Sequence, residues 1–212
     1  MSDSKEFNLK DHIFFLLQNE PFFSAFSRRI HKRASKAVPT AGVKINEKTQ
    51  QFEMLYNPEF FSKLSNSHIC GVLKHEMYHI ILEHVTTRRP TDGLKKIDNI
   101  AMDLAINSYL HGELPSENDP GPIMPSGQPM VGCFPGEGPF AELPSRQTYE
   151  WYLDALKSMA DQQEGDGEAG FGDMDSIDDH GGFGETEANS SGAMEIAKER
   201  LKQNIRDAAQ EA

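Results

Sequence analysis

The residues best suited to chemistry form the run His-Glu-Met-Tyr-His at positions 75–79. Histidines four positions apart on a helix differ by about 40° and roughly one turn, so both imidazoles can reach one ion. Glu76 then lies beside that ion, where it can take a proton from a bound water molecule. Two ligands and a neighbouring base are typical of zinc hydrolases. The motif therefore predicts zinc at His75 and His79, with Glu76 as the general base.

The sequence around the motif favours a helix with two different faces. In a helical projection His79 and Glu76 lie within about 100° of His75. The large apolar side chains fall on the opposite side: Leu73, Met77, Ile80 and Ile81. A solvated helix face, the alternative explanation, does not account for so much apolar sequence. We expect this helix to begin after a cap at Ser65 or Asn66 and to run to about Arg88.

A third zinc ligand must come from elsewhere, and the nearby candidates are His84 and Glu83. His84 projects onto the apolar face and can turn toward the ion only if the helix ends before it. We therefore interpret His84 as a buried histidine that supports a ligand. Glu83 faces the ion but lies about 6 Å further along the axis than His79. It is better placed to orient a ligand or to bind substrate.

The next predicted helix, residues 97–110, carries a third candidate. Asn99, Asp103 and Asn107 form a polar stripe with a spacing of four, and most residues around them are apolar. A buried carboxylate needs a partner, and a metal ion is a good one. Asp103 is therefore the third ligand that the sequence favours, with His84 and Glu83 as the alternatives.

The elements that must position these residues give a mostly helical α+β fold. Two alternating runs, residues 42–46 and 52–56, predict a β-hairpin, and we expect residues 52–56 to offer an edge to an extended peptide. Helices are expected at 9–17, 22–36 and 145–159, in addition to the two already described.

The composition divides the chain of 212 residues into a compact domain, 1–160, a linker, 161–192, and a terminal helix, 193–212. Between positions 150 and 187 there are twelve acidic residues and one basic residue, so the linker is expected to be acidic and disordered. The terminal segment carries an amphipathic stripe: Met194, Ala197, Leu201 and Ile205. We expect the linker and the helix to bind a protein partner, and the compact domain to fold without them.

Charge and cysteine content exclude several classes of protein. The formal net charge of −12 disfavours nucleic-acid binding, and the basic run 28–36 is better explained as a solvated helix end. No run is long and apolar enough for a membrane span. The polar N-terminus does not resemble a signal peptide, and two cysteines make no disulfide framework. We therefore expect a cytoplasmic protein.

Four runs of sequence together resemble the putative metallopeptidase domain family. They are Thr40-Ala-Gly-Val, Tyr56-Asn-Pro-Glu-Phe, the segment 71–84 and the segment 99–107. The resemblance implies a zincin-like fold, a zinc ion and a peptide or protein substrate. In that family the domain is often followed by a von Willebrand factor A-like module. The pattern departs from that of metzincins, because no glycine follows His79 and no third histidine sits at the metzincin spacing.

The resemblance leaves two functional hypotheses. In the first, zinc activates water for peptide-bond hydrolysis with Glu76 as the base. In the second, the zincin-like domain is catalytically silent and serves as a protein-binding scaffold. A minor hypothesis places Asp179 or His180, in the acidic linker, on the open position of the zinc ion as an inhibitory plug.

Overall fold

The computed structural model describes every residue except 1–6, 47, 91–92, 125 and 163–190. The described residues form seven α-helices, one short 3₁₀ helix and a three-stranded sheet, which confirms the predicted α+β class. In chain order the elements are α1 (Leu9–Asn19), α2 (Pro21–Ser27), β1 (His31–Ala34), β2 (Ala41–Ile45), β3 (Phe52–Tyr56), α3 (Pro58–Phe61), α4 (Asn66–Ile81), α5 (Lys96–Asn107), η1 (Gly138–Phe140), α6 (Tyr149–Gln162) and α7 (Ser191–Glu211). The acidic linker and its Asp178-Asp179-His180 run lie outside the described residues.

The sheet has the strand order β1-β3-β2. β2 and β3 are antiparallel, with Val43 opposite Met54, and they form the predicted hairpin. β1 pairs with the other side of β3 in parallel, with Lys32 opposite Met54. Because β3 is hydrogen-bonded on both sides, the prediction that residues 52–56 offer a free edge is wrong. The edge strand that packs against α4 is β2.

The helix predicted for residues 22–36 is the largest error in the sequence-based assignment. α2 ends at Ser27, and residues 31–34 form the edge strand β1. Pairing with β3 outweighs the local helical preference of this segment. Basic side chains stabilise the new path: Arg33 Nε donates to Glu53 Oε1 over 3.1 Å, and Lys32 Nζ donates to the carbonyl oxygen of Ile30 over 3.0 Å.

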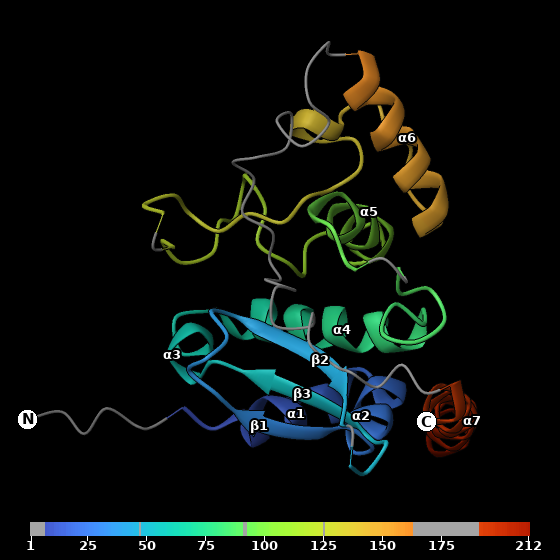
Figure 1. Cartoon of the computed structure of the whole chain (residues 1–212). Coiled ribbons are helices and arrows are strands. Elements are labelled where there is room, and N and C mark those ends of the chain that lie inside the picture. The colour runs from blue at the N-terminus through green and yellow to red at the C-terminus, as the bar shows by residue number, and fades with distance from the viewer. Residues whose placement is uncertain (1–6, 47, 91–92, 125, 163–190) are drawn as a thin grey trace, which may run out of the picture.

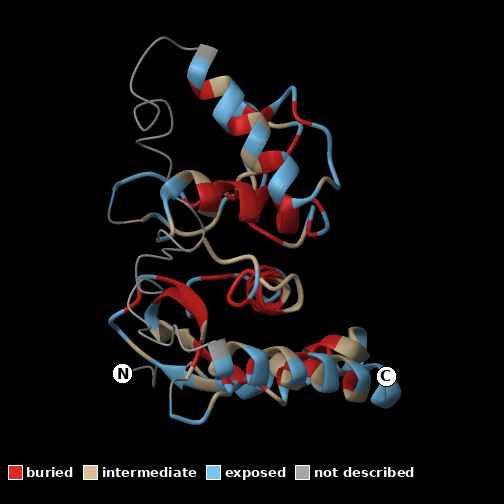
Figure 2. Cartoon of the chain, turned by 45° about the vertical axis from the view of Figure 1, so that its right-hand side comes forward, coloured by how far each residue is buried: buried red, intermediate tan, exposed pale blue. Residues whose placement is uncertain are grey.

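α4 lies at the centre of the fold, between the sheet and α5 (Figure 1). The predicted cap is present, because Ser65 Oγ accepts a hydrogen bond from the backbone N–H of His68. Buried residues gather along α4 and α5 in the middle of the molecule (Figure 2). A neighbouring loop approaches α4 so closely at Gly71 that an added Cβ would lie 2.0 Å from the carbonyl oxygen of Glu113. Glycine is therefore required at this position.

α4 ends at Ile81, seven residues before the predicted end near Arg88. The backbone N–H of His84 donates to the carbonyl of His79, and that of Glu83 donates to Ile80. Glu83 adopts the left-handed conformation, with φ = 63°. These two bonds form the Schellman motif that often ends helices with a glycine, and here the left-handed residue is a glutamate. The end of the helix could not be predicted from the sequence, because no glycine occupies the left-handed position.

Two hydrophobic clusters meet along α5. The larger one joins the sheet, α1, α2 and α4, and it includes Ile106 and Leu110. The smaller one joins α5 to α6 through residues such as Leu104 and Tyr152. Asp103 and Asn107 lie on α5 between these apolar sets, on the side that meets α4. The polar side chains are thus buried between two apolar clusters.

α7 packs against α2 and α4, and it buries Ala197, Leu201 and Ala208 in the larger cluster. Arg28 and Arg29 form ion pairs with Glu211 near its C-terminus. The apolar stripe of α7 is therefore covered by this domain itself. The sequence-based expectation was that this helix binds a protein partner, whereas its apolar stripe packs within the chain. That residues 1–160 fold without the helix stays a prediction.

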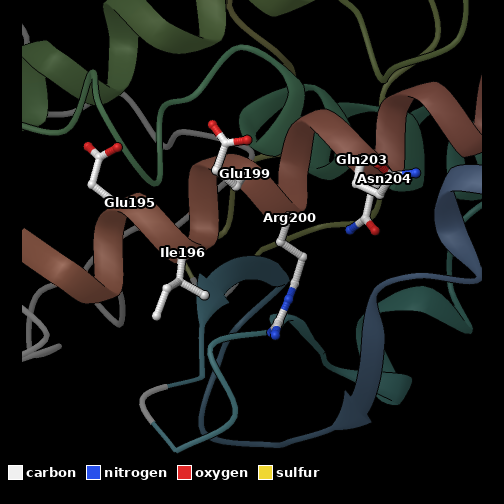
Figure 3. Close-up of a pocket in the computed structure, with 6 residues that line it drawn as sticks. All are labelled: Glu195, Ile196, Glu199, Arg200, Gln203 and Asn204. Carbon is white, nitrogen blue, oxygen red and sulfur yellow. The ribbon is translucent and has the colours of Figure 1, made fainter.

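The outer side of α7 forms a shallow groove lined by Glu195, Ile196, Glu199, Arg200, Gln203 and Asn204 (Figure 3). Arg200 reaches away from the helix axis and donates to the carbonyl oxygen of Thr49 over 2.8 Å. Since every lining residue belongs to α7, this groove is not an entrance to the α4–α5 interface. Across the described part of the chain, the helices are too short or too polar to cross a bilayer.

Candidate metal centre

Three predicted residues converge at the crossing of α4 and α5. His75 Nε2 and His79 Nε2 lie 3.1 Å apart. Asp103 Oδ1 lies 3.5 Å from the first of these nitrogens and 3.4 Å from the second. Within the described residues, these three make up the one group of histidine, cysteine, aspartate and glutamate side chains whose ligand atoms could hold a metal ion.

The spacing of these three atoms fits a tetrahedral metal ion. Zinc bonds nitrogen and carboxylate oxygen at about 2.0–2.2 Å, so two ligands of a tetrahedral site lie about 3.3–3.6 Å apart. The three observed separations run from 3.1 to 3.5 Å. Two imidazole nitrogens and one carboxylate oxygen are also a donor set that zinc accepts. The three atoms are therefore close enough together to bind one ion.

The orientation of His75 is fixed by Asn107, one turn beyond Asp103 on α5. Nδ1 of His75 lies 2.9 Å from Asn107 Oδ1. The amide orientation is set on its other side, where Asn107 Nδ2 donates to the carbonyl oxygen of Cys133 over 2.8 Å. Asn107 Oδ1 must then accept, so Nδ1 of His75 carries the proton. The lone pair of Nε2 is left to face His79 and Asp103.

His79 is contacted on its Nδ1 side by His84. The two Nδ1 atoms lie 3.1 Å apart, and the rings meet at an interplanar angle of 70°. The early end of α4 brings His84 to this position. The sequence-based interpretation of His84 as a buried support for a ligand agrees with its location, although the geometric reason differs from the one predicted.

Glu83, the other alternative ligand, points elsewhere. Its left-handed backbone takes it out of the helical projection that had placed it toward the ion. The pKa of Lys202 on α7 is raised mainly by Glu199, and Glu83 contributes a smaller part. Its carboxylate is thus close enough to α7 to act on that helix, and it does not belong to the convergent group.

The electrostatics of the centre favour a cation. Burial lowers the pKa of His75, but the hydrogen bond and charge of Asp103, with a further contribution from Glu76, raise it above its ordinary value overall. The two carboxylates thus place negative charge against His75. A proton or a metal ion can supply the opposing charge.

The centre is closed to solvent. His75, Glu76, His79 and Asp103 are each at most 1% exposed. Cys133 also borders the centre, with its Sγ 3.9 Å from Asn107 Nδ2. Burial, reinforced by the charge of Asp103, raises the pKa of the Cys133 thiol well above its ordinary value.

Sequence reasoning missed the roles of Asn107 and Cys133. Asn107 belongs to the predicted polar stripe. Its spacing of four from Asp103 was the one sequence feature that could have placed it beside the ligands. Cys133 lies in a loop rich in proline and glycine, where no periodicity relates it to α5.

Comparison with known proteins agrees with this centre. The family described as "Putative metallopeptidase domain" matches residues 4–211. The chain belongs to this family. The match confirms the resemblance read from the sequence, and it extends through α7, which is consistent with the packing of that helix on the domain.

A protein of Thermotoga maritima, described as an uncharacterized protein, is similar to this metallopeptidase-family chain. The two are 27% identical over 154 residues, which make up 70% of this chain and 38% of the relative. The chain thus spans well under half the length of that relative. No solved structure matches the chain.

Proposed function

We propose that this chain is a zinc-dependent peptidase domain of zincin-like type. The observation that carries the proposal is the convergence of His75, His79 and Asp103 beside Glu76, in a chain that belongs to the metallopeptidase family. The ligand-bearing helix α4 packs against β2, the edge strand of a small sheet. This arrangement supports the zincin-like assignment.

In the proposed site, His75, His79 and Asp103 hold the ion. Zinc supplies a Lewis acid that makes water more acidic and polarises a carbonyl group. Glu76 follows His75 directly and contributes to the raised pKa of that histidine, so its carboxylate lies close to the ligands. Glu76 accepts a proton from water and returns it to the leaving amine. A peptide or protein is the proposed substrate.

The burial of the centre sets a condition on this activity. Because Glu76 and the three ligands are almost fully covered, a peptide reaches them only when a covering segment moves. Outside α4 and α5, the Glu83–His84 turn contacts His79, and the loop that carries Cys133 contacts Asn107. A motion that opens the centre to a peptide would have to displace at least one of these two segments while α4 and α5 stay packed together.

The same burial supports a second candidate function. Structural zinc sites are closed, whereas catalytic sites keep one position open to water. In the second function, the ion stabilises the α4–α5 crossing of a scaffold that binds another protein, and Glu76 performs no proton transfer.

The Glu76→Gln variant separates the two candidates. It preserves the size of the side chain but cannot act as a base. A peptidase should lose at least about a hundredfold in turnover on a peptide library while retaining its zinc. A scaffold should show no zinc-dependent hydrolysis in either protein. Hydrolysis of equal rate in both proteins would refute Glu76 as the base.

A further inference from the structure

His84 is a buried histidine outside the proposed ligand set. It is 3% exposed, and its ring is enclosed between His79, 5.1 Å away between ring centroids, and Tyr149, 5.8 Å away. It lies beyond the end of α4, so it owes its position to the turn at Glu83 and not to helical spacing.

The geometry separates His84 from the ion. His79 directs Nε2 toward His75 and Asp103, while its Nδ1 faces Nδ1 of His84 at 3.1 Å. The two nitrogens of one imidazole point in diverging directions, so an ion bound at Nε2 cannot also be reached from the Nδ1 side. His84 therefore lies on the far side of the His79 ring from the convergent group.

We propose that His84 is a positioning residue for the metal ligand His79. Nδ1 of His84 accepts a hydrogen bond from the Nδ1–H of His79. This bond fixes the tautomer of His79 in which the lone pair of Nε2 faces the ion. Asn107 does the same for His75 through the oxygen of its amide. Each histidine ligand is thus oriented by one acceptor that does not touch the metal. This inference rests on the metal centre proposed above.

The turn at Glu83, which places His84 beside His79, contains a strained backbone conformation. Glu83 has φ = 63°, a region in which a Cβ atom is unfavourable and glycine is usual. Two backbone hydrogen bonds hold the turn, from Glu83 to Ile80 and from His84 to His79. The second bond joins the same two residues whose rings meet, so the backbone sets the distance between the imidazoles.

Further contacts connect His84 to the helix that carries Asp103. Tyr149, which packs on His84, donates its O–H to Asp98 Oδ1 over 3.1 Å. Asp98 Oδ2 accepts from the backbone N–H of Lys95 over 2.9 Å and so caps the start of α5. His84 therefore lies where the end of α4, the start of α5 and the start of α6 meet.

Three variants of the full chain test the proposal. His84→Leu removes the acceptor and retains an apolar side chain of similar size. His84→Asn places an amide oxygen near the position of Nδ1, so it can still accept from His79. Glu83→Gly, the matched control, relieves the left-handed strain and leaves His84 in place. Zinc affinity is measured by competition with a chelator, the Co²⁺ form by visible absorption, and the tautomer of His79 by ¹⁵N NMR.

We expect His84→Leu to weaken zinc binding by about 10–100-fold and to broaden or shift the Co²⁺ bands. His84→Asn should restore affinity to within a few-fold and keep the Nδ1–H tautomer of His79. Glu83→Gly should bind zinc like the wild type. If His84→Leu does not fold, the other two variants still test the proposal.

Two results would overturn the proposal. Wild-type affinity and spectra in His84→Leu would show that His84 does not position the ligand. Loss of zinc in both His84 variants would identify His84 as a ligand. If the wild type itself takes up no zinc, the proposed metal centre fails first, and that result is distinct from both of these.

Discussion

Nδ1 of His75 lies 2.9 Å from Oδ1 of Asn107, whose amide nitrogen is held by the carbonyl oxygen of Cys133. Replacing Asn107 with leucine removes the acceptor and frees the His75 ring to rotate. We expect zinc affinity to fall by about 10–100-fold. Chelator competition measures the change. Asn107→Asp, which keeps an acceptor, is the control and should lose less; equal loss in both variants would show that the contact to Cys133 matters more.

Asp103 is the third ligand in this account. Asp103→Asn keeps the volume of the side chain but removes its negative charge, so zinc binding should fall further than it does in His84→Asn. Equilibrium dialysis followed by metal analysis compares the two. A variant at Asp103 that retains full zinc, beside a variant at His84 that loses it, would reverse the assignment.

Zinc binding should depend on pH through His75. The folded pKa of this histidine is raised above the ordinary value of 6.5, so its protonated form stabilises the metal-free fold fully below that pH. This contribution is lost as pH rises through the raised pKa. Zinc needs the neutral ring and competes with the proton. The increase in Tm on zinc addition should therefore be larger at about pH 8 than at about pH 6. An equal increase at both pH values would show that zinc does not compete with a proton on the histidine ligands.

α7 should be part of the folding unit. Leu201 is 2% exposed within the larger cluster, so Leu201→Ala should lower the free energy of unfolding by about 2–5 kcal/mol. The exposed Ile196 on the same helix is the control, and Ile196→Ala should change it by less than about 0.5 kcal/mol. Urea titrations of both variants give the comparison. A small effect at Leu201 would mean that the domain folds without α7, as its sequence alone had suggested.

The sequence located most of the helices and the candidate centre because their signals are local. Helical spacing relates His75 to His79, and the polar stripe identifies Asp103 among apolar neighbours. The β-hairpin was predicted in the same way, from two short runs of alternating apolar and polar residues. These features depend on residues within a few turns of one another.

The errors arose where distant contacts decide the conformation. Residues 31–34 become a strand because β3 offers them a partner, which local propensity does not reveal. The end of α4 rests on a left-handed glutamate that no sequence rule favours. The pairing of Asn107 with Cys133 joins segments 26 positions apart. Each of these depends on the assembled fold.

We propose that side chains from α4 and α5 together hold one metal ion. Metal analysis of the purified full chain, beside the variants His75→Ala and His79→Ala, tests it most directly. We expect about one zinc per chain in the wild type and a loss of zinc in each variant, because two remaining ligands rarely bind tightly. Full zinc occupancy after removal of both histidines, or no zinc in the wild type under metal-replete conditions, would refute the proposed metal centre.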